Sequence, residues 1–145
     1  MSANSRMTIA VHVLTWMSLD RQQNDVATSE RIAGSVNTNP VVIRRCLGDL
    51  RRAGLVQAKR GGGAGWSLMR EPEDITLLAV YLAVENGNLF GLHHSPPNGE
   101  CPIGFGIQPA LGRVYGTLEE QLQQELARTT IADMLRDVMA QQNSS

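Results

Sequence analysis

The stretch from Asn39 to Trp66 decides the fold of this chain, and it reads NPVVIRRCLGDLRRAGLVQAKRGGGAGW. Asn39 is a good helix N-cap, and Pro40 suits the first helical position because its missing N–H needs no partner there. The apolar side chains that follow recur at helical spacing: Ile43, Cys46, Leu47 and Leu50. Gly54 then offers a residue that can end the helix with a positive φ. The stretch therefore begins with an amphipathic helix rich in arginine.

A glycine-rich hairpin follows this helix. Leu55–Ala58 and Trp66–Leu68 are expected to form two strands, joined by a tip whose glycines allow a tight turn and a close approach to a backbone: Gly61, Gly62, Gly63 and Gly65. Upstream, Glu30–Val36 is expected to form a short helix that ends in a turn before Asn39. Helix, turn, helix and hairpin in this order are the layout of a winged helix-turn-helix. In that fold the second helix reads the major groove and the hairpin, or wing, lies along the backbone beside it.

Helical patterns also flank the predicted winged helix-turn-helix. Residues 5–19 carry apolar side chains at helical spacing, and Asp74 is expected to cap a helix over Ile75–Val84. After a loop, a long helix is expected from about Pro109, and Thr130 is expected to cap a last helix. The long helix carries an apolar seam that suits a partner helix: Leu111, Tyr115, Leu118, Leu122 and Leu126. The fold class is therefore mainly α (α+β), with a two-stranded wing and a long C-terminal dimerisation helix.

These patterns divide the chain into three expected segments. Residues 1–84 are the winged helix-turn-helix DNA-binding domain, residues 85–108 are a loop, and residues 109–145 are the dimerisation helices. The loop is rich in Gly, Pro, Asn and His, and a loop of this length in a compact domain is usually functional or disordered. We therefore treat residues 85–108 as a candidate sensor segment.

The net charge of −1 hides a strong asymmetry between the two halves of the chain. Residues 1–70 hold ten Lys and Arg against four Asp and Glu, for a net charge of +6, whereas residues 71–145 have a net charge of −7. The positive charge coincides with the predicted helix and wing. This favours a nucleic-acid surface on the first half over a merely solvated one.

The expected DNA contacts follow from the positions of these side chains. On the helix face opposite the apolar stripe, Arg44 and Arg45 can pair with guanine. Val41 and Val42 can meet thymine methyl groups. The candidate phosphate contacts come from helix starts, including their backbone amides, and from the wing: Thr28, Ser29, Thr38, Asn39, Lys59 and Arg60.

Composition and motifs disfavour several other classes of protein. No run of 18 or more apolar residues is present, so no membrane span is expected. The N-terminus lacks an apolar run with a cleavage site, and two distant cysteines form no disulfide framework, so a reducing cytoplasm is expected. We expect no enzyme, because no paired carboxylates or nucleophile triad stand out, and the glycine run lacks the G-K-[ST] ending of a phosphate-binding loop.

Four stretches carry a resemblance to a known family. They are SVNTNPVVIRR at Ser35–Arg45, LRRAGLV at Leu50–Val56, RGGGAGW at Arg60–Trp66 and LAVYLAVE at Leu78–Glu85. Together they resemble the Rrf2 family of bacterial winged-helix repressors. The segment CPIG at Cys101 and the long helix after it are similar to the YwnA-like branch of that family. The resemblance covers nearly the whole chain.

The resemblance implies a homodimer that is joined by the long C-terminal helix and binds a partly palindromic operator in double-stranded DNA. It also implies that the DNA contacts come from the start of the recognition helix and from the wing arginine: Asn39, Val41, Val42, Arg44 and Arg60. Iron–sulfur members of the family hold their cluster with three cysteines between the helix after the wing and the long helix. This chain has only Cys101 there, so we expect no cluster and no other cofactor.

Three interpretations of the loop stay open. Cys101 precedes a helix whose N-terminus could lower its pKa, so it is a candidate redox-sensing thiol. His93, His94 and Cys101 could instead bind zinc or copper, but adjacent histidines in polar loops usually have no such role, and no metal site is expected. In the third interpretation the loop serves packing, and the effector is a small molecule or absent. Cys46 falls on the apolar stripe and is expected to be a small core residue.

The function expected from these observations is sequence-specific transcriptional regulation by a dimer, with repression favoured and a thiol response of Cys101 as one route of control. The alternative is a winged-helix module that binds protein rather than DNA. The basic residues on the helix and wing argue against that alternative, and a DNA affinity that is absent or insensitive to salt would favour it.

Overall fold

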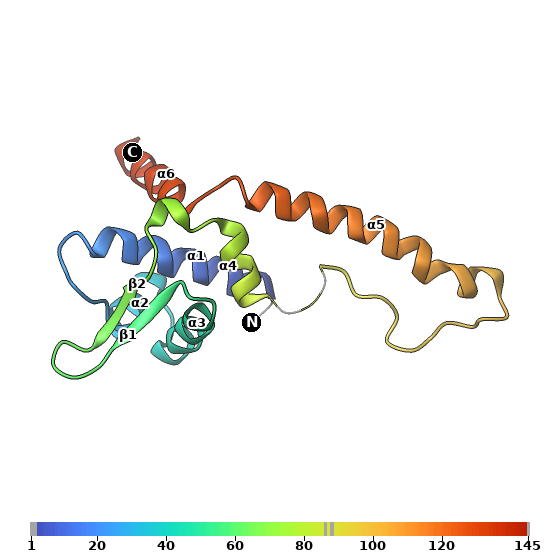
Figure 1. Ribbon diagram of the computed structural model, residues 1–145, viewed down its shortest axis with the longest axis horizontal. Coiled ribbons are helices and arrows are strands. Elements are labelled where there is room, and N and C mark those ends of the chain that lie inside the picture. The colour runs from blue at the N-terminus through green and yellow to red at the C-terminus, as the bar shows by residue number, and fades with distance from the viewer. Residues whose placement is uncertain (1–2, 86, 88, 145) are drawn as a thin grey trace. The chain divides into compact units, whose positions relative to one another are not determined.

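The computed structural model describes residues 3–85, 87 and 89–144. Its elements in chain order are α1 (Ala3–Asp20), α2 (Ser29–Val36), α3 (Pro40–Arg52), β1 (Val56–Lys59), β2 (Gly65–Leu68), the 3-10 helix η1 (Pro72–Asp74), α4 (Leu77–Val84), α5 (Pro102–Leu126) and α6 (Ile131–Asn143) (Figure 1). They fall into two compact units. The first, the winged-helix unit, combines Met1–Glu85 with Leu126–Ser145, and the second spans Asn86–Glu125. The predicted fold class is confirmed.

The helix-turn-helix forms where the capping residues predict it. The Thr28 side chain accepts a hydrogen bond from the Arg31 N–H at the start of α2. Asn37 ends that helix in the left-handed region, with φ 63°. The Asn39 side chain then accepts from the Val41 N–H at the start of α3, and Pro40 occupies the first turn. These short-range contacts set the turn between the two helices.

One aliphatic core holds the winged-helix unit together. The predicted stripe of α3 is buried, including Cys46, and it packs with Val13 and Leu14 of α1 and Ile32 of α2. Val80 of α4 and Ile131 of α6 belong to the same cluster. Burial of such side chains is the main stabilising term of a fold like this one. The expected core role of Cys46 is confirmed.

The wing is a two-stranded antiparallel hairpin. β1 and β2 pair from Val56 opposite Leu68 to Lys59 opposite Gly65, one residue away from the strand limits that the sequence predicts. Gly61 and Gly63 take φ values of 87° and 76° at the tip, which side chains with a Cβ rarely adopt. The hairpin extends away from the helices of its unit (Figure 1).

Two predicted helix starts are wrong. Asp74 does not cap α4: it ends η1, and Thr76 caps α4 by accepting from the Ala79 N–H. The long helix α5 begins at Pro102 rather than near Pro109, so the loop before it is shorter than predicted. Pro102 fits the first helical turn as well as Pro109 does, because neither has an N–H to leave unpaired. The Phe105 N–H bonds the Cys101 carbonyl 2.8 Å away, which continues the first turn.

Helix α6 packs within the winged-helix unit, whereas the predicted segment 109–145 groups it with the long helix. Thr130 caps α6 through a capping box with Asp133, as predicted for the cap itself. The Ile131 N–H donates to the Ile75 carbonyl at 2.8 Å, and the Ile131 side chain is fully buried. Figure 1 shows α6 on the opposite side of α1 from α3 and the wing.

The second unit consists of the segment after α4 and most of α5. Phe90 stacks on Tyr115 of the predicted seam, with ring centroids 4.9 Å apart. Other apolar side chains of α5 are exposed, among them Ile103, Val114 and Leu118. In the described part of the chain, no helix combines the length and the hydropathy that a membrane span requires.

Candidate nucleic-acid interface

Helix α3 presents a ridge opposite its buried stripe. Val41, Arg45, Gly48 and Arg52 succeed one another at steps of four, three and four residues, which aligns them along one helix face. Val41 is 50% exposed, and both arginines are exposed. Because Gly48 has no side chain, the middle of this ridge is low, and a Cβ added there would meet only the Arg52 guanidinium at 3.7 Å.

Arg44 and Val42 lie on opposite flanks of this ridge. The Arg44 guanidinium is 3.4 Å from the Glu30 carboxylate on α2, so this arginine turns toward the preceding helix. Val42 is half-buried and lines a hollow on the other side, together with Ile9 of α1 and Val84 of α4. Of the four predicted base-contacting residues, Val41 and Arg45 therefore point most directly outward.

The amides at the start of α3 are engaged inside the protein. The Thr38 N–H donates to the Ala33 carbonyl, and the Val41 and Val42 N–H groups donate to Asn39. These three amides therefore already have partners within the protein, and a phosphate contact from the Asn39 amide stays a prediction. The Asn39 side chain is exposed and Thr38 is half-buried, so their side chains stay candidates.

The two candidates at the start of α2 differ in exposure. Ser29 is only 7% exposed, so its side chain belongs to the interior of the unit rather than to a DNA-facing surface. Thr28 is half-buried, and its hydroxyl accepts from the Arg31 N–H. A phosphate contact by Thr28 would have to share that hydroxyl with the cap.

The wing carries exposed positive charge. Lys59 ends β1, Arg60 follows it, and both side chains are exposed. Among the described residues neither has an ion pair, and the same is true of Arg45 on α3, whereas Arg52 pairs with Asp49. Cations without a carboxylate partner are available to phosphate or to base edges. Within the described residues, the ridge and the wing thus each offer at least one cation without an ion pair: Arg45 on the ridge, and Lys59 and Arg60 on the wing.

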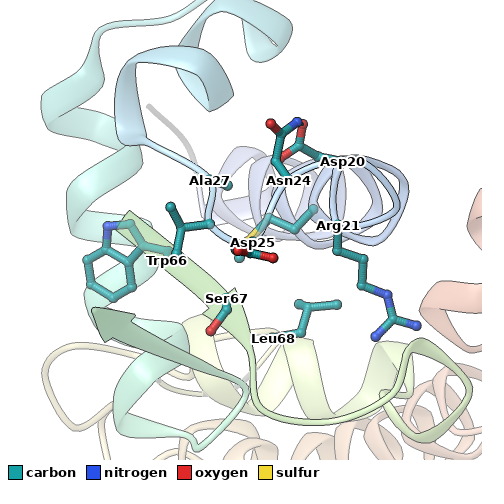
Figure 2. Close-up of a pocket in the computed structure, with 10 residues that line it drawn as sticks. Asp20, Arg21, Asn24, Asp25, Ala27, Trp66, Ser67 and Leu68 are labelled. Atoms are coloured by element: carbon teal, nitrogen blue, oxygen red, sulfur yellow. The ribbon is translucent and has the colours of Figure 1, made fainter. Parts of the chain in front are cut away.

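A close backbone contact joins the base of the wing to the helices. Ala27 and Trp66 exchange two backbone hydrogen bonds of 2.8 Å, and they lie side by side at one edge of the hollow in Figure 2. At Gly65, an added Cβ would lie 2.8 Å from the Ala27 carbonyl oxygen, so only glycine fits. These contacts hold the wing in place relative to α2 and α3.

A small hollow lies beside this contact. It measures about 100 Å³ and lies between the end of α1 and β2 (Figure 2). Two of its charged side chains are already paired: Asp20 with Arg31, and Arg21 with Glu71 at 2.8 Å. The Arg31 guanidinium also lies over the Trp16 ring, 5.1 Å from its centroid, so Trp16 supports α2.

The predicted sensor residues lie in the second unit. Cys101 is exposed, and the backbone N–H groups of Gly104 and Ile103 lower its pKa below the usual value of a thiol. His93 is 3.4 Å from the Gln108 amide rather than paired with a second ligand-type side chain. Within the described residues, no three His, Cys, Asp or Glu side chains gather as metal ligands would.

Comparison with known proteins agrees with this geometry. Residues 3–137 match the model of the family Rrf2, which is described as an iron-dependent transcriptional regulator. The chain belongs to the Rrf2 family. Within that family it is 41% identical over 133 residues to YwnA of Bacillus subtilis (strain 168), which is named as an HTH-type transcriptional regulator, and the alignment covers 91% of this chain and 96% of YwnA. The predicted family and branch are confirmed.

Solved structures support the same assignment. A crystal structure described as a DNA-binding protein shares 37% of its sequence with this chain, with a TM-score of 0.72 over 90% of this chain and 98% of that one. The IscR protein of T. potens has the same fold, with a TM-score of 0.70 at 21% identity over 95% of this chain and 87% of that one. The overall fold of this chain is thus shared with these two solved structures.

The donor set of this Rrf2 chain does not fit an iron–sulfur cluster. The sequence has two cysteines, whereas such clusters are held by several thiolates. Cys46 is buried in the core, where burial and then the nearby Asp49 charge raise its pKa from 9.0 to about 12, so its thiol stays protonated. Cys101 alone cannot replace a set of ligands.

Glu30, Gly48 and Gly65 belong to the interface geometry but are absent from the predicted contacts. Glu30 acts through Arg44, which is distant in the sequence, so no local pattern marks it. The glycine-rich tip does mark Gly65 for a close backbone approach, but its partner Ala27 could not be read from the sequence. The sequence does contain a signal for Gly48, because a glycine in the middle of an arginine-rich helix destabilises that helix and is therefore expected to serve another purpose.

Proposed function

We propose that this Rrf2-family protein is a dimeric, sequence-specific repressor that binds operator DNA in the cytoplasm and has no enzymatic activity. The observation that carries the proposal is the ridge Val41–Arg45–Gly48–Arg52 beside a wing whose two cations have no ion pair among the described residues. A ridge of this kind matches the shape and charge of a major groove, and the wing cations match the neighbouring phosphates.

Each contact residue has a distinct expected role. Arg45 has no carboxylate partner among the described residues and is the candidate for a bidentate contact with guanine. Val41 is the candidate for a thymine methyl group, and Gly48 lets the helix approach the floor of the groove. Arg44, Lys59 and Arg60 are assigned to phosphates, where Arg44 would exchange Glu30 for the DNA backbone.

The dimer is proposed to form through α5. Ile103 is 71% exposed, and Val114 and Leu118 are exposed on the same helix. A second copy of α5 would cover these apolar side chains in a two-fold interface. Two recognition helices would then meet half-sites about one helical turn apart, as in other helix-turn-helix dimers.

Control through Cys101 is the second part of the proposal. An exposed thiol with a lowered pKa is the type of cysteine that reacts with oxidants, and oxidation would change the start of α5. The variant Cys101→Ser should bind DNA normally and lose any response to oxidant. A response that persists in this variant would remove Cys101 from the account.

The proposal is tested by titrating the purified protein against genomic fragments that include its own upstream region. We expect selective binding to one fragment, with an affinity that falls steeply as salt rises. Arg45→Ala and Arg60→Ala should each weaken it, whereas Arg136→Ala, which removes the same charge from α6, should not. If no fragment is selected, or if salt has no effect, the protein-interaction module becomes the better account.

A further inference from the structure

A second hollow lies against the flank of the recognition helix. It has a volume of about 250 Å³ and is bounded by α1, α3 and the end of α4. Its residues all belong to the winged-helix unit. The volume is below the range of drug-sized pockets, so it suits a small molecule.

The floor of this hollow is apolar. It consists of Ile9, Cys46 and Val84, of which Cys46 and Val84 are buried and Ile9 is half-buried. The Cys46 thiol carries no charge at neutral pH, because its pKa is raised to about 12. Transfer of a hydrocarbon group from water onto this floor would therefore be favourable.

The rim of the hollow is positively charged. Arg6 of α1 and Arg45 of α3 line it from different helices, and Asp49 is its one lining carboxylate. Asp49 is already paired with Arg52, so its carboxylate is engaged with a cation outside the rim. The Arg6 guanidinium lies 3.9 Å from Glu85, which is a long ion pair, and Arg45 has none within the described chain. The rim thus has spare donors for an anion.

From this combination we propose that the hollow is a binding site for a small carboxylate with an apolar body. The carboxylate would accept hydrogen bonds from Arg6 and Arg45, because guanidinium groups match carboxylates in geometry and charge. The apolar body would lie on Ile9 and Val84. A neutral molecule of the same shape would bind more weakly, because it offers no anion to the two arginines of the rim.

Occupation of this site would oppose DNA binding, an inference that rests on the proposed function. Arg45 belongs both to the rim of the hollow and to the outward ridge of α3. A bound carboxylate would hold its guanidinium and add negative charge beside the DNA. The small carboxylate would therefore act as an inducer, and DNA would weaken its binding by the same factor.

Sodium benzoate is a suitable probe, and benzyl alcohol is its neutral control. Both would be titrated into the full-length protein without DNA, at constant ionic strength, while backbone amide resonances are followed by NMR. We expect saturable benzoate shifts centred on Ile9, Cys46 and Val84, with a Kd of about 1 mM or tighter. Benzyl alcohol should bind at least about tenfold more weakly, because it lacks the charge that pairs with arginine.

Two variants test the location of the site. Arg6→Gln removes one rim charge, and Ile9→Phe fills the floor while it keeps both arginines. Each should weaken benzoate at least about tenfold and leave operator affinity unchanged, since neither residue is assigned to DNA. Arg6→Gln removes the ion-pair partner of Glu85 and could for that reason fail to fold. In that case Ile9→Phe alone tests the location of the site. Equal binding of benzyl alcohol, shifts without saturation, or benzoate binding that survives Ile9→Phe would overturn the proposal.

The regulatory part needs the operator fragment as well. Saturating benzoate should raise the operator Kd about tenfold in the wild type, and the operator should raise the benzoate Kd by the same factor. Bound benzoate with an unchanged operator Kd would overturn the inducer role. Because benzoate binding is measured without DNA, a protein that binds benzoate but no operator would refute the proposed function and leave the site standing.

Discussion

Replacing Gly65 by alanine should detach the base of the wing. The added Cβ would lie 2.8 Å from the Ala27 carbonyl oxygen and 3.0 Å from Val26, so the strand or the segment at Ala27 must move. Movement would strain or break the two backbone hydrogen bonds between Ala27 and Trp66. At about 1 kcal/mol net for each bond, the loss is about 2 kcal/mol, which lowers the Tm of a domain of this size by about 4–8 °C.

Gly62→Ala is the matched control for this change. Gly62 lies in the same hairpin, has no positive φ and has open space where the Cβ would be, so its stability should stay within about 0.5 kcal/mol of the wild type. Urea unfolding of the three proteins measures the difference, and salt-dependent titrations with the operator show whether a displaced wing loses its phosphate contacts. Equal unfolding midpoints for Gly65→Ala and Gly62→Ala would refute the reasoning.

Two further predictions concern the thiols and the cap of α6. Iodoacetamide at pH 8 should alkylate Cys101 in the folded protein and spare Cys46, because the buried Cys46 thiol has a pKa raised to about 12. Mass spectrometry of the digested protein measures which cysteine is labelled. Rapid labelling of Cys46 would contradict its core position. The pKa of Asp133 is lowered, first by the Thr130 N–H, so its stabilising contribution is complete above its unfolded pKa and is lost as pH falls through the folded one. Asp133→Asn should therefore lower the Tm at neutral pH and have a vanishing effect in acid, and a deficit independent of pH would count against the capping box.

Elements that depend on short-range contacts could be predicted from the sequence. Asn39 caps α3 through an amide two residues away, and Thr130 caps α6 through an amide three residues away, so each signal is contained in a few letters. The buried stripe of α3 follows from helical spacing in the same way. The wing strands can be predicted to within a residue, because glycines mark the tip that separates them.

Elements set by distant segments could not be predicted. Ile75 stays extended because its carbonyl accepts the Ile131 N–H, and Leu77 donates to the Thr129 carbonyl, so α4 starts later than its apolar run. The same contacts attach α6 to the winged-helix unit. No local pattern around Asp74 reports a partner so far along the chain, and the sequence therefore indicates a cap at Asp74 that the structure does not have.

The candidate interface also combines features that helical spacing predicts with features that depend on distant segments. Helical spacing alone places Arg45 on the ridge and Arg44 on its flank, whereas the ion pair of Arg44 with Glu30 depends on the packing of α2 against α3. The hollow beneath Arg45 needs Arg6 and Val84, which come from α1 and α4. The residue types of such a surface can be read from the sequence, whereas their roles require the packing of the helices.

The central claim is that the ridge of α3 reads bases while the wing binds phosphates. It is tested most directly by measuring the affinity of the wild type, Arg45→Ala and Arg60→Ala for an operator in which each base pair is substituted in turn. We predict that Arg45→Ala loses about 1–3 kcal/mol and becomes indifferent to one guanine in each half-site, whereas Arg60→Ala weakens every sequence alike and lowers the salt dependence. Uniform weakening by Arg45→Ala, with full discrimination retained at every base pair, would contradict the account.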